Sequence, residues 1–513
     1  MRSLPLHLLA LLLLAAGCAP GPPPAEPAPA PDPAEEEDAL DLATVAESAI
    51  TAQDAFNHIE FLASDEMRGR DTPSPELELA AEYLAERFQE LGLEGAGDDG
   101  SFLQWWPFQR TPLDPEASRV GARVGDVEME WRYADEFFAI PAPSDALDAT
   151  PLYVPDPGMV MELPEEARGS PLLVSLPGGL DEQFAQVIQA GMQFGAPAVV
   201  LIMDDETEAP QIHQFGQALE AGAVGQLPLQ VIGLRRDVGQ ALLEEAGVDP
   251  DSARDPPALL EGVELTISTT FSQETDDVPN VVAKLPGSDP ELRDTYVVLT
   301  AHYDHVGVGP PDESGDSIYS GADDNASGTA ALVKVARALA ELPEAPARSV
   351  IFLAVSGEEK GLLGSAHYAQ NPTVPQEGIV ANLNMDMVSR NHPDTIHAIG
   401  EEYTTLGPLV HEVAQEHPEL GLEVAPDPEP EEQAFLRSDH FSFVEQGVPA
   451  LMLTTWLHDD YHLPSDTPDR IDADKVARVA RLAFLFTHRL ASDPDPPEWT
   501  EEGEELLRGL MMP

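Results

Sequence analysis

Histidines and carboxylates gather in five short segments after residue 300, each at or beside the end of a predicted strand. The segments are His302-Tyr303-Asp304, Asp323-Asp324, Glu358-Glu359, Asn384-Met385-Asp386 and Asp460-Tyr461-His462. A lone histidine or aspartate is more often solvated or structural, so no single segment indicates a site. Together they supply imidazole nitrogens and carboxylate oxygens, the ligands that zinc takes in proteins, and a catalytic zinc keeps one position open for water.

A centre with two such metals has a recognisable set of requirements. Metals about 3.5–4 Å apart can hold a hydroxide between them and polarise a carbonyl group. The arrangement needs two histidines, one shared carboxylate, two further carboxylates and a separate general base, and the five segments provide all of these residue types. His302 and Asp304 stand two apart at a predicted strand end, so they face the same way and Asp304 can hold the His302 ring in one tautomer.

Predicted strands alternate with helices around these segments. Residues 46–95 and Gly328–Leu342 have the apolar composition and spacing of helices. Short apolar runs indicate buried strands at Tyr296–Ala301, Ser349–Val355, Val380–Met385 and Pro449–Leu453. This alternation predicts an α/β layer sandwich with a mixed, mostly parallel sheet. Ligands of such sheets bind at the carboxyl ends of the strands, which is where the five segments lie.

The segments also carry a family resemblance. The motifs "AHYDH", "GADDNASG", "SGEEKGLLGS", "NMDM", "SDHFSF" and "YHLPSDT" occur in this order, with "LASDEMRGRDTPS" upstream. The chain thereby resembles metallopeptidase family 28, the two-zinc aminopeptidases with transferrin-receptor-like and glutaminyl-cyclase-like relatives, over roughly residues 46–110 and 275–490. The resemblance implies a three-layer α/β/α zinc exopeptidase fold and a hydrolase that removes N-terminal residues from peptides.

The resemblance also implies a set of zinc ligands. It places one zinc on His302 and Asp386 and the other on Glu359 and His462, with Asp324 as the bridging carboxylate. The implied cofactors are two Zn²⁺ per chain, although cobalt or manganese can occupy sites of similar chemistry.

Other residues of the motifs receive less direct roles. Glu358 is implied as the general base for the attacking water, and Asp304 as the partner of His302. Asp323 is the alternative to Asp324, its ordinary role being turn stabilisation by side-chain bonding to the backbone. His458, four residues before His462, is the alternative to that ligand.

Several nearby side chains are expected outside the ligand set. His305 is expected in the pocket wall or at the surface, because it does not share a strand face with Asp304. His440 is expected behind the ligands or on the substrate side. The candidates for lining the substrate pocket are Phe435, Arg437, Trp456 and Tyr461.

Three other functions remain open on the same fold. A glutaminyl cyclase forms a ring at an N-terminal glutamine and typically keeps a single zinc. A carboxypeptidase needs a cation for the substrate's terminal carboxylate, which Arg437 leaves possible. A receptor-like binding protein would have no need of a general base such as Glu358, so the complete set of six side chains disfavours it.

The stretch between the two family segments indicates an inserted domain at residues 112–272, with residues 42–111 and 273–491 as the discontinuous peptidase domain. Strands are predicted at Leu172–Leu176, Ala198–Met203 and Leu229–Leu234, and a helix at Phe184–Phe194. The order of these elements, with "GAPAVVLIM" and "LPLQVIGLRRDVGQALLEEAG", resembles a protease-associated domain. Its role and any oligomeric state are open.

The N-terminus has the pattern of an export signal. Residues 1–17 combine Arg2 with an apolar run at Leu8–Ala16 that is too short to span a bilayer, and the run ends just before Cys18. The pattern resembles a bacterial lipoprotein signal, which implies lipidation of Cys18, the only cysteine, and an anchor on a periplasmic or cell-surface side. Pro-, Ala- and Glu-rich residues 18–41 indicate a tether, and residues 492–513 an acidic tail.

The charge of the chain excludes one class of partner. Asp and Glu number 93 against 26 Lys and Arg, a net charge of -67. A field of this sign repels phosphate backbones, so nucleic acid is not an expected ligand. The family resemblance instead implies peptides with a free N-terminus as the substrates.

Overall fold

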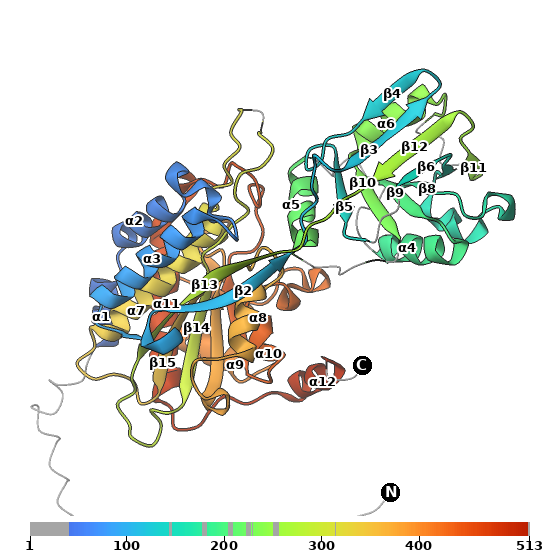
Figure 1. The fold of residues 1–513 in the computed structure, drawn as a ribbon. Coiled ribbons are helices and arrows are strands. Elements are labelled where there is room, and N and C mark those ends of the chain that lie inside the picture. The colour runs from blue at the N-terminus through green and yellow to red at the C-terminus, as the bar shows by residue number, and fades with distance from the viewer. Residues whose placement is uncertain are drawn as a thin grey trace, which may run out of the picture. The chain divides into compact units, whose positions relative to one another are not determined.

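Nine strands from both ends of the chain form one sheet in the computed structural model (Figure 1). In spatial order they are β1 (Glu94–Gly95), β13 (Glu274–Leu285), β15 (Ser349–Val355), β14 (Tyr296–His302), β16 (Ile379–Met385), β19 (Ala450–Thr454), β17 (Thr395–Ile399) and β18 (Glu423–Ala425), with β2 (Leu103–Arg110) also paired to β13. The central strands β15, β14, β16 and β19 are parallel, whereas β13 and β17 join them antiparallel. The mixed α/β fold is thus confirmed, with its parallel part at the centre.

Helices cover both faces of this sheet. Because side chains of a strand alternate between faces, Val297 and Leu299 of β14 enter one core cluster while Tyr296 and Val298 enter another. The first cluster includes residues of α1 (Leu42–Ala49), α2 (Ala52–Leu62), α3 (Pro75–Glu90), α7 (Gly328–Ala340), α9 (Leu406–Glu416) and α11 (Ala473–Ser492). The second includes residues of α8 (Leu363–Gln370) and α10 (His440–Val444). The three layers follow from this division.

Local signals explain the helix limits. Ser74 caps α3 by accepting a hydrogen bond from the Leu77 amide, and Pro75 occupies the first turn, where its missing N–H costs nothing. Gly92, just beyond the helix, has a φ of 76°, a left-handed conformation that glycine adopts without strain.

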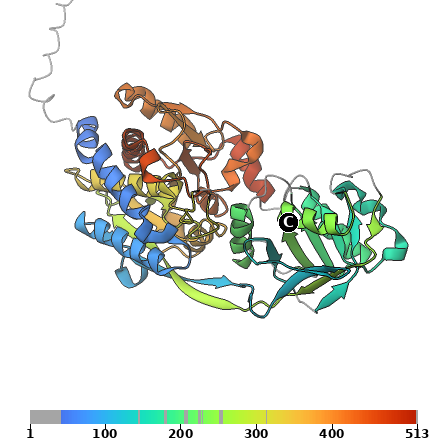
Figure 2. The same ribbon diagram turned by 90° about the horizontal axis from the view of Figure 1, so that it is seen from above.

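Residues between β2 and β13 form two further sheets. One contains β5 (Phe137–Ile140), β7 (Leu152–Val154), β8 (Leu172–Ser175), β9 (Ala198–Ile202), β10 (Gln230–Leu234) and β11 (Ala258–Leu259). The other contains β3 (Arg119–Val124), β4 (Val127–Glu130), β6 (Leu147–Ala149) and β12 (Val263–Ser268). The α-helices that the structure describes here are α4 (Glu182–Phe194), α5 (Ala209–Glu220) and α6 (Arg236–Glu245). Figure 2 shows β2 and β13 side by side where the chain leads into and out of these elements. The exact boundaries of the insertion and its likeness to a protease-associated domain stay predictions.

Part of the expected acidic tail at residues 492–513 is helical. The helix α12 (Glu501–Leu510) follows α11, and its Leu506 and Leu507 pack on a buried cluster together with Trp499. The Trp499 indole N–H also donates to the Gly447 carbonyl oxygen at 3.1 Å. These apolar side chains are spaced among glutamates, so the acidic composition of the segment gave no indication of an amphipathic helix.

The structure describes residues 41–142, 146–176, 182–203, 209–221, 227, 229–249, 256–312 and 314–510. Leu42–Pro513 form one compact unit. The predicted export signal, Cys18 and nearly all of the tether lie outside the described residues. Within those ranges, no helix has the length and apolarity needed to cross a membrane.

Candidate metal centre

The predicted site residues come together at the carboxyl ends of the parallel strands. His302 is the last residue of β14, Glu358 and Glu359 follow β15 within a few residues, and Asp386 directly follows β16. Because these three strands are adjacent and parallel, their ends deliver the side chains to one edge of the sheet. Asp324 comes from the turn before α7, which packs on the same strands.

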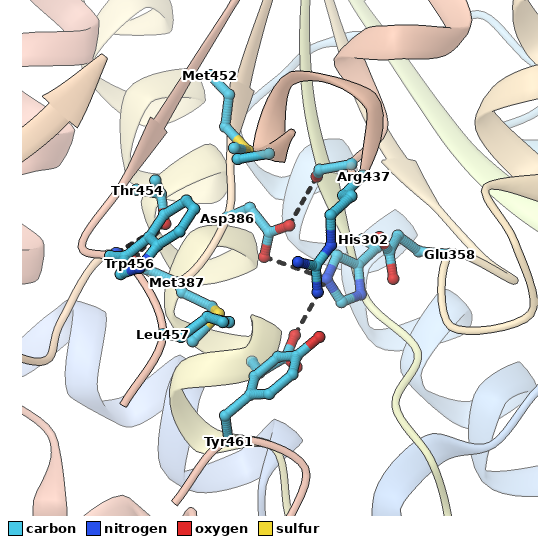
Figure 3. A pocket seen from close by; sticks show the side chains of 13 residues that line it. His302, Glu358, Asp386, Met387, Arg437, Met452, Thr454, Trp456, Leu457 and Tyr461 are labelled. Carbon is cyan, nitrogen blue, oxygen red and sulfur yellow. Dashed lines mark hydrogen bonds and ion pairs between the residues drawn. The ribbon is translucent and has the colours of Figure 1, made fainter. Parts of the chain in front are cut away.

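One half of the cluster surrounds the His302 ring. Its Nε2 atom lies 3.2 Å from Asp386 Oδ1 (Figure 3). The same atom lies 3.2 Å from Asp324 Oδ1. Ser438, which the sequence did not single out, donates its hydroxyl to Asp386 Oδ2 at 2.6 Å. His302 Nε2 therefore faces two carboxylates, one of which is held in place from behind.

The other half surrounds His462. Its Nε2 atom lies 3.1 Å from Asp324 Oδ2 and 3.0 Å from Glu359 Oε2. Asp324 thus directs one oxygen at each histidine, and it is the carboxylate shared by the two halves. This is the geometry expected of a bridging ligand.

The donor chemistry suits two zinc ions. Two groups of side chains place their ligand atoms within 4.8 Å of one another: His305, Asp324, Glu359 and His462, and His302, Glu358 and Asp386. Imidazole nitrogens mixed with carboxylate oxygens are ligands that zinc prefers. The predicted ligands therefore fit the metal, and their assignment to individual ions stays a prediction.

The pKa values of the two adjacent glutamates are shifted in opposite directions. Burial raises the pKa of the Glu358 carboxyl well above its ordinary value, and the nearby Glu359 charge raises it further, although His302 opposes this. Burial also acts to raise the pKa of Glu359, but His462 and His305 outweigh it and hold that pKa below its ordinary value. Neighbours in the sequence are thus placed in different electrostatic environments.

Asp304 lies behind His302 but holds the loop after β15 more directly than the ring. Its Oδ2 accepts hydrogen bonds from the Gly357 amide at 2.8 Å and from Thr72 Oγ1 at 2.9 Å. His302 Nδ1 lies 3.7 Å from Asp304 Oδ1 and 3.3 Å from the Asp304 carbonyl oxygen. Asp304 therefore positions both His302 and the segment that carries Glu358.

The alternative ligands Asp323 and His458 face each other instead of the cluster. Asp323 Oδ1 accepts from the Ser389 amide at 2.9 Å, and its Oδ2 lies 3.4 Å from His458 Nε2. Asp466 accepts hydrogen bonds from the backbone amides of Asp323 and Asp324 and so fixes the turn in which both residues lie. This geometry favours Asp324 and His462 as the ligands.

The expected position of His305 was wrong. Its side chain is fully buried, and Nδ1 lies 2.7 Å from Glu359 Oε1, inside the cluster. The strand ends at His302, so its two-residue alternation does not extend to His305, whose amide instead bonds to the Arg70 carbonyl oxygen at 3.3 Å. His440 is also buried, and its ring packs edge-on against Phe435 at 5.1 Å between centroids.

A pocket opens beside the cluster. Arg437, Trp456 and Tyr461 line it, as expected from the sequence, together with His302, Asp324, Glu358, Asp386 and the apolar residues Met387, Met452 and Leu457 (Figure 3). Phe435 does not line it, because its ring is turned into the interior against His440 and Tyr403. The metal centre therefore faces a space with several apolar walls.

A buried arginine joins the segments around the site. Arg70 has no exposed surface, and its guanidinium donates to the carbonyl oxygens of Tyr303 at 2.8 Å, Ser320 at 2.8 Å and Gly321 at 3.1 Å, and to that of Leu62. Burial lowers the pKa of Arg70 to about 10, so it stays charged at neutral pH. Arg70 thus fixes the loops that carry Asp304 and Asp324.

The chain is similar to known aminopeptidases in sequence and in fold. The sequence is 24% identical over 366 residues to aminopeptidase YwaD of Bacillus subtilis, covering 70% of each chain. The fold matches an aminopeptidase from Aneurinibacillus sp. strain AM-1 with a TM-score of 0.62 at 20% identity, covering 89% of this chain and 97% of the other. It matches a zinc aminopeptidase from Bacillus subtilis with a TM-score of 0.60 at 17% identity, covering 86% and 96%.

A family model accounts for the part of the chain that carries the cluster. The model of peptidase family M28 matches residues 280–487, a range that includes His302, Asp324, Glu359, Asp386 and His462. The matched range also contains all the parallel strands whose ends deliver these side chains. Residues 280–487 of this chain are therefore a peptidase family M28 domain.

Proposed function

We propose that this protein is a two-zinc aminopeptidase that removes residues from the free amino end of peptides. The observation that carries the proposal is the placement of Asp324 between two histidine–carboxylate pairs, beside Glu358 and a pocket. The names of the relatives, an aminopeptidase by sequence and a zinc aminopeptidase by fold, support it.

In the proposed hydrolysis, five side chains would bind the zinc ions and a sixth, Glu358, would transfer the proton. His302 and Asp386 would hold one zinc, Glu359 and His462 the other, and Asp324 both. Two zinc ions there would supply Lewis-acid activation of the attacking water and of the scissile carbonyl. Glu358 takes the proton of the water as it attacks and returns it to the leaving amine.

The test uses one short peptide with a free and with an acetylated N-terminus. Release of an amino acid from the free peptide alone, lost with a chelator and restored by zinc, is the expected result. Release from both peptides would instead indicate a carboxypeptidase, for which the pocket residue Arg437 would receive the terminal carboxylate. Absence of release from either, with zinc bound, would direct the test to cyclisation of an N-terminal glutamine.

The pocket walls predict a side-chain preference. Met387, Met452, Trp456 and Leu457 offer apolar surface to the residue that is removed. Each buried methylene contributes about 0.8 kcal/mol, so the three extra carbons of leucine over alanine correspond to roughly a 50-fold gain in kcat/KM. Aminoacyl amides of leucine, alanine and glutamate would measure this, and faster hydrolysis of the glutamyl amide than of the leucyl amide would contradict the prediction.

We also propose that the protein is exported and anchored by a lipid on Cys18. The proposal rests on the sequence pattern, in which the single cysteine follows a short apolar run. Replacing Cys18→Ser is expected to stop incorporation of labelled fatty acid and to release the protein from the membrane fraction. Because the chain has no other cysteine, labelling that persists in this variant would exclude thioether lipidation as the anchor.

A further inference from the structure

One helix of the inserted residues reaches the metal centre. Gln214 lies in α5, and its side-chain Nε2 donates to the carbonyl oxygen of His462 at 2.9 Å. The Oε1 atom of the same amide lies 3.3 Å from His462 Nδ1. A single glutamine therefore contacts both the backbone and the ring of a predicted zinc ligand.

The backbone of His462 has a strained conformation that the two contacts with Gln214 help to hold. His462 has a φ of 54°, in the left-handed region that costs a non-glycine residue free energy and persists only where its surroundings hold it. Tyr461 stacks on the His462 ring with centroids 3.9 Å apart and fixes the ring plane. The amide of Gln214 adds hydrogen bonds at the two polar atoms of His462 that face away from the cluster.

The contact also selects a tautomer of the ring. His462 Nε2 faces Asp324 and Glu359, so Nε2 is the atom available to a metal. A ring that binds metal through Nε2 carries its proton on Nδ1, and that N–H needs an acceptor. Gln214 Oε1 is in the position to accept it.

A second glutamine, Gln217, lies one turn further along α5 and contacts different residues. Gln217 Oε1 accepts from Lys360 Nζ at 2.9 Å, and its Nε2 lies 3.2 Å from Asp71 Oδ2. Lys360 in turn pairs with Asp71 Oδ1 at 2.7 Å, and its side chain is almost entirely buried. Gln217 thus attaches α5 to the residues beside the cluster. Its amide contacts Asp71, Lys360 and the Val306 carbonyl oxygen, all outside the ligand set.

We infer that Gln214 is a positioning residue for His462, so that the inserted residues complete one of the two metal subsites. The inference rests on the proposed two-zinc function. It assigns to the insertion a part in metal binding that is separate from any effect on substrate entry. Gln214 acts through His462 and is not itself placed to touch the reacting atoms.

The test compares metal affinities of the whole chain and of matched variants. Gln214→Met keeps the length of the side chain and removes its amide, and Gln217→Met makes the same change one turn away. Zinc is titrated in competition with a chromophoric chelator, and Co²⁺ is used for its visible absorption spectrum. We expect Gln214→Met to weaken zinc at one of the two subsites by about 10–100-fold and to shift one Co²⁺ band, with Gln217→Met within about threefold of the unaltered chain.

A third variant separates positioning from packing. Gln214→Glu retains an acceptor for His462 Nδ1 and is expected to recover most of the zinc affinity that Gln214→Met loses. Unchanged affinity and spectrum in Gln214→Met would overturn the inference, as would equal losses in the two methionine variants, which would indicate only docking of α5. Recovery in Gln214→Glu supports the inference even if thermal melting shows that Gln214→Met is destabilised. Failure of the unaltered chain to bind zinc would count against the proposed function instead.

Discussion

Replacing Glu358→Gln is expected to lower kcat by about 10⁴-fold while both zinc ions stay bound, because general acid–base catalysis contributes up to this factor. The glutamine has the same shape but cannot take a proton from water. The predicted ligands His302, Asp324, Glu359, Asp386 and His462 are untouched by the change. Steady-state hydrolysis of a leucyl amide, with zinc content measured on the same sample, separates the two effects.

Glu359 offers a matched control for that experiment. It is adjacent in the sequence and equally buried in the cluster, but its carboxylate faces His462 and His305. Glu359→Gln should therefore lose zinc as well as activity. A Glu358→Gln protein within tenfold of normal kcat, or one that has lost its metal, would remove Glu358 from the role of general base.

Replacing Asp324→Asn is expected to release metal from both subsites. Asp324 directs Oδ1 at His302 and Oδ2 at His462, so one substitution weakens both halves of the centre. Loss of a direct ligand should exceed the 10–100-fold cost typical of a supporting residue, so we expect zinc affinity to fall more than about 100-fold. Zinc content after dialysis against a weak chelator would measure this.

The neighbouring aspartate provides the comparison. Asp323 bonds to the Ser389 amide and faces His458, away from the cluster. Asp323→Asn should keep its zinc and lower the free energy of unfolding by about 1 kcal/mol, the typical worth of one hydrogen bond. The reverse result, with zinc lost from Asp323→Asn and kept by Asp324→Asn, would exchange the roles of the two residues.

Residues at the ends of strands were the most predictable part of the site. The apolar runs that end at His302 and before Glu358 and Asp386 are long enough to identify buried strands, and parallel strands bring their ends together. The family motifs then indicated that Asp324 rather than Asp323 faces the cluster, and they assigned different roles to Glu358 and Glu359, which both face it. The structure places all five predicted ligands in one cluster, as the sequence led us to expect.

Contacts made by loops and by distant segments were not predictable in the same way. His305 was misplaced because strand alternation stops at His302, and only the path of the following loop turns its ring toward Glu359. Gln214 lies 248 residues from His462 in the sequence, in a segment for which the sequence predicted no helix or strand. Ser438 opens the motif "SDHFSF" but was assigned no role, because a serine in a loop has many ordinary roles.

The buried guanidinium of Arg70 has a consequence for how the centre is assembled. Its acceptors include Tyr303, Ser320 and Gly321, which lie between 233 and 251 residues away along the chain. Contacts of such long sequence separation form late, because closing the intervening loop costs entropy before any bond compensates for it. During synthesis the ribosome must therefore deliver the chain well past the insertion before the loops around Asp324 can take their final shape. A metal held by Asp324 would then have its full ligand set only after these loops have closed.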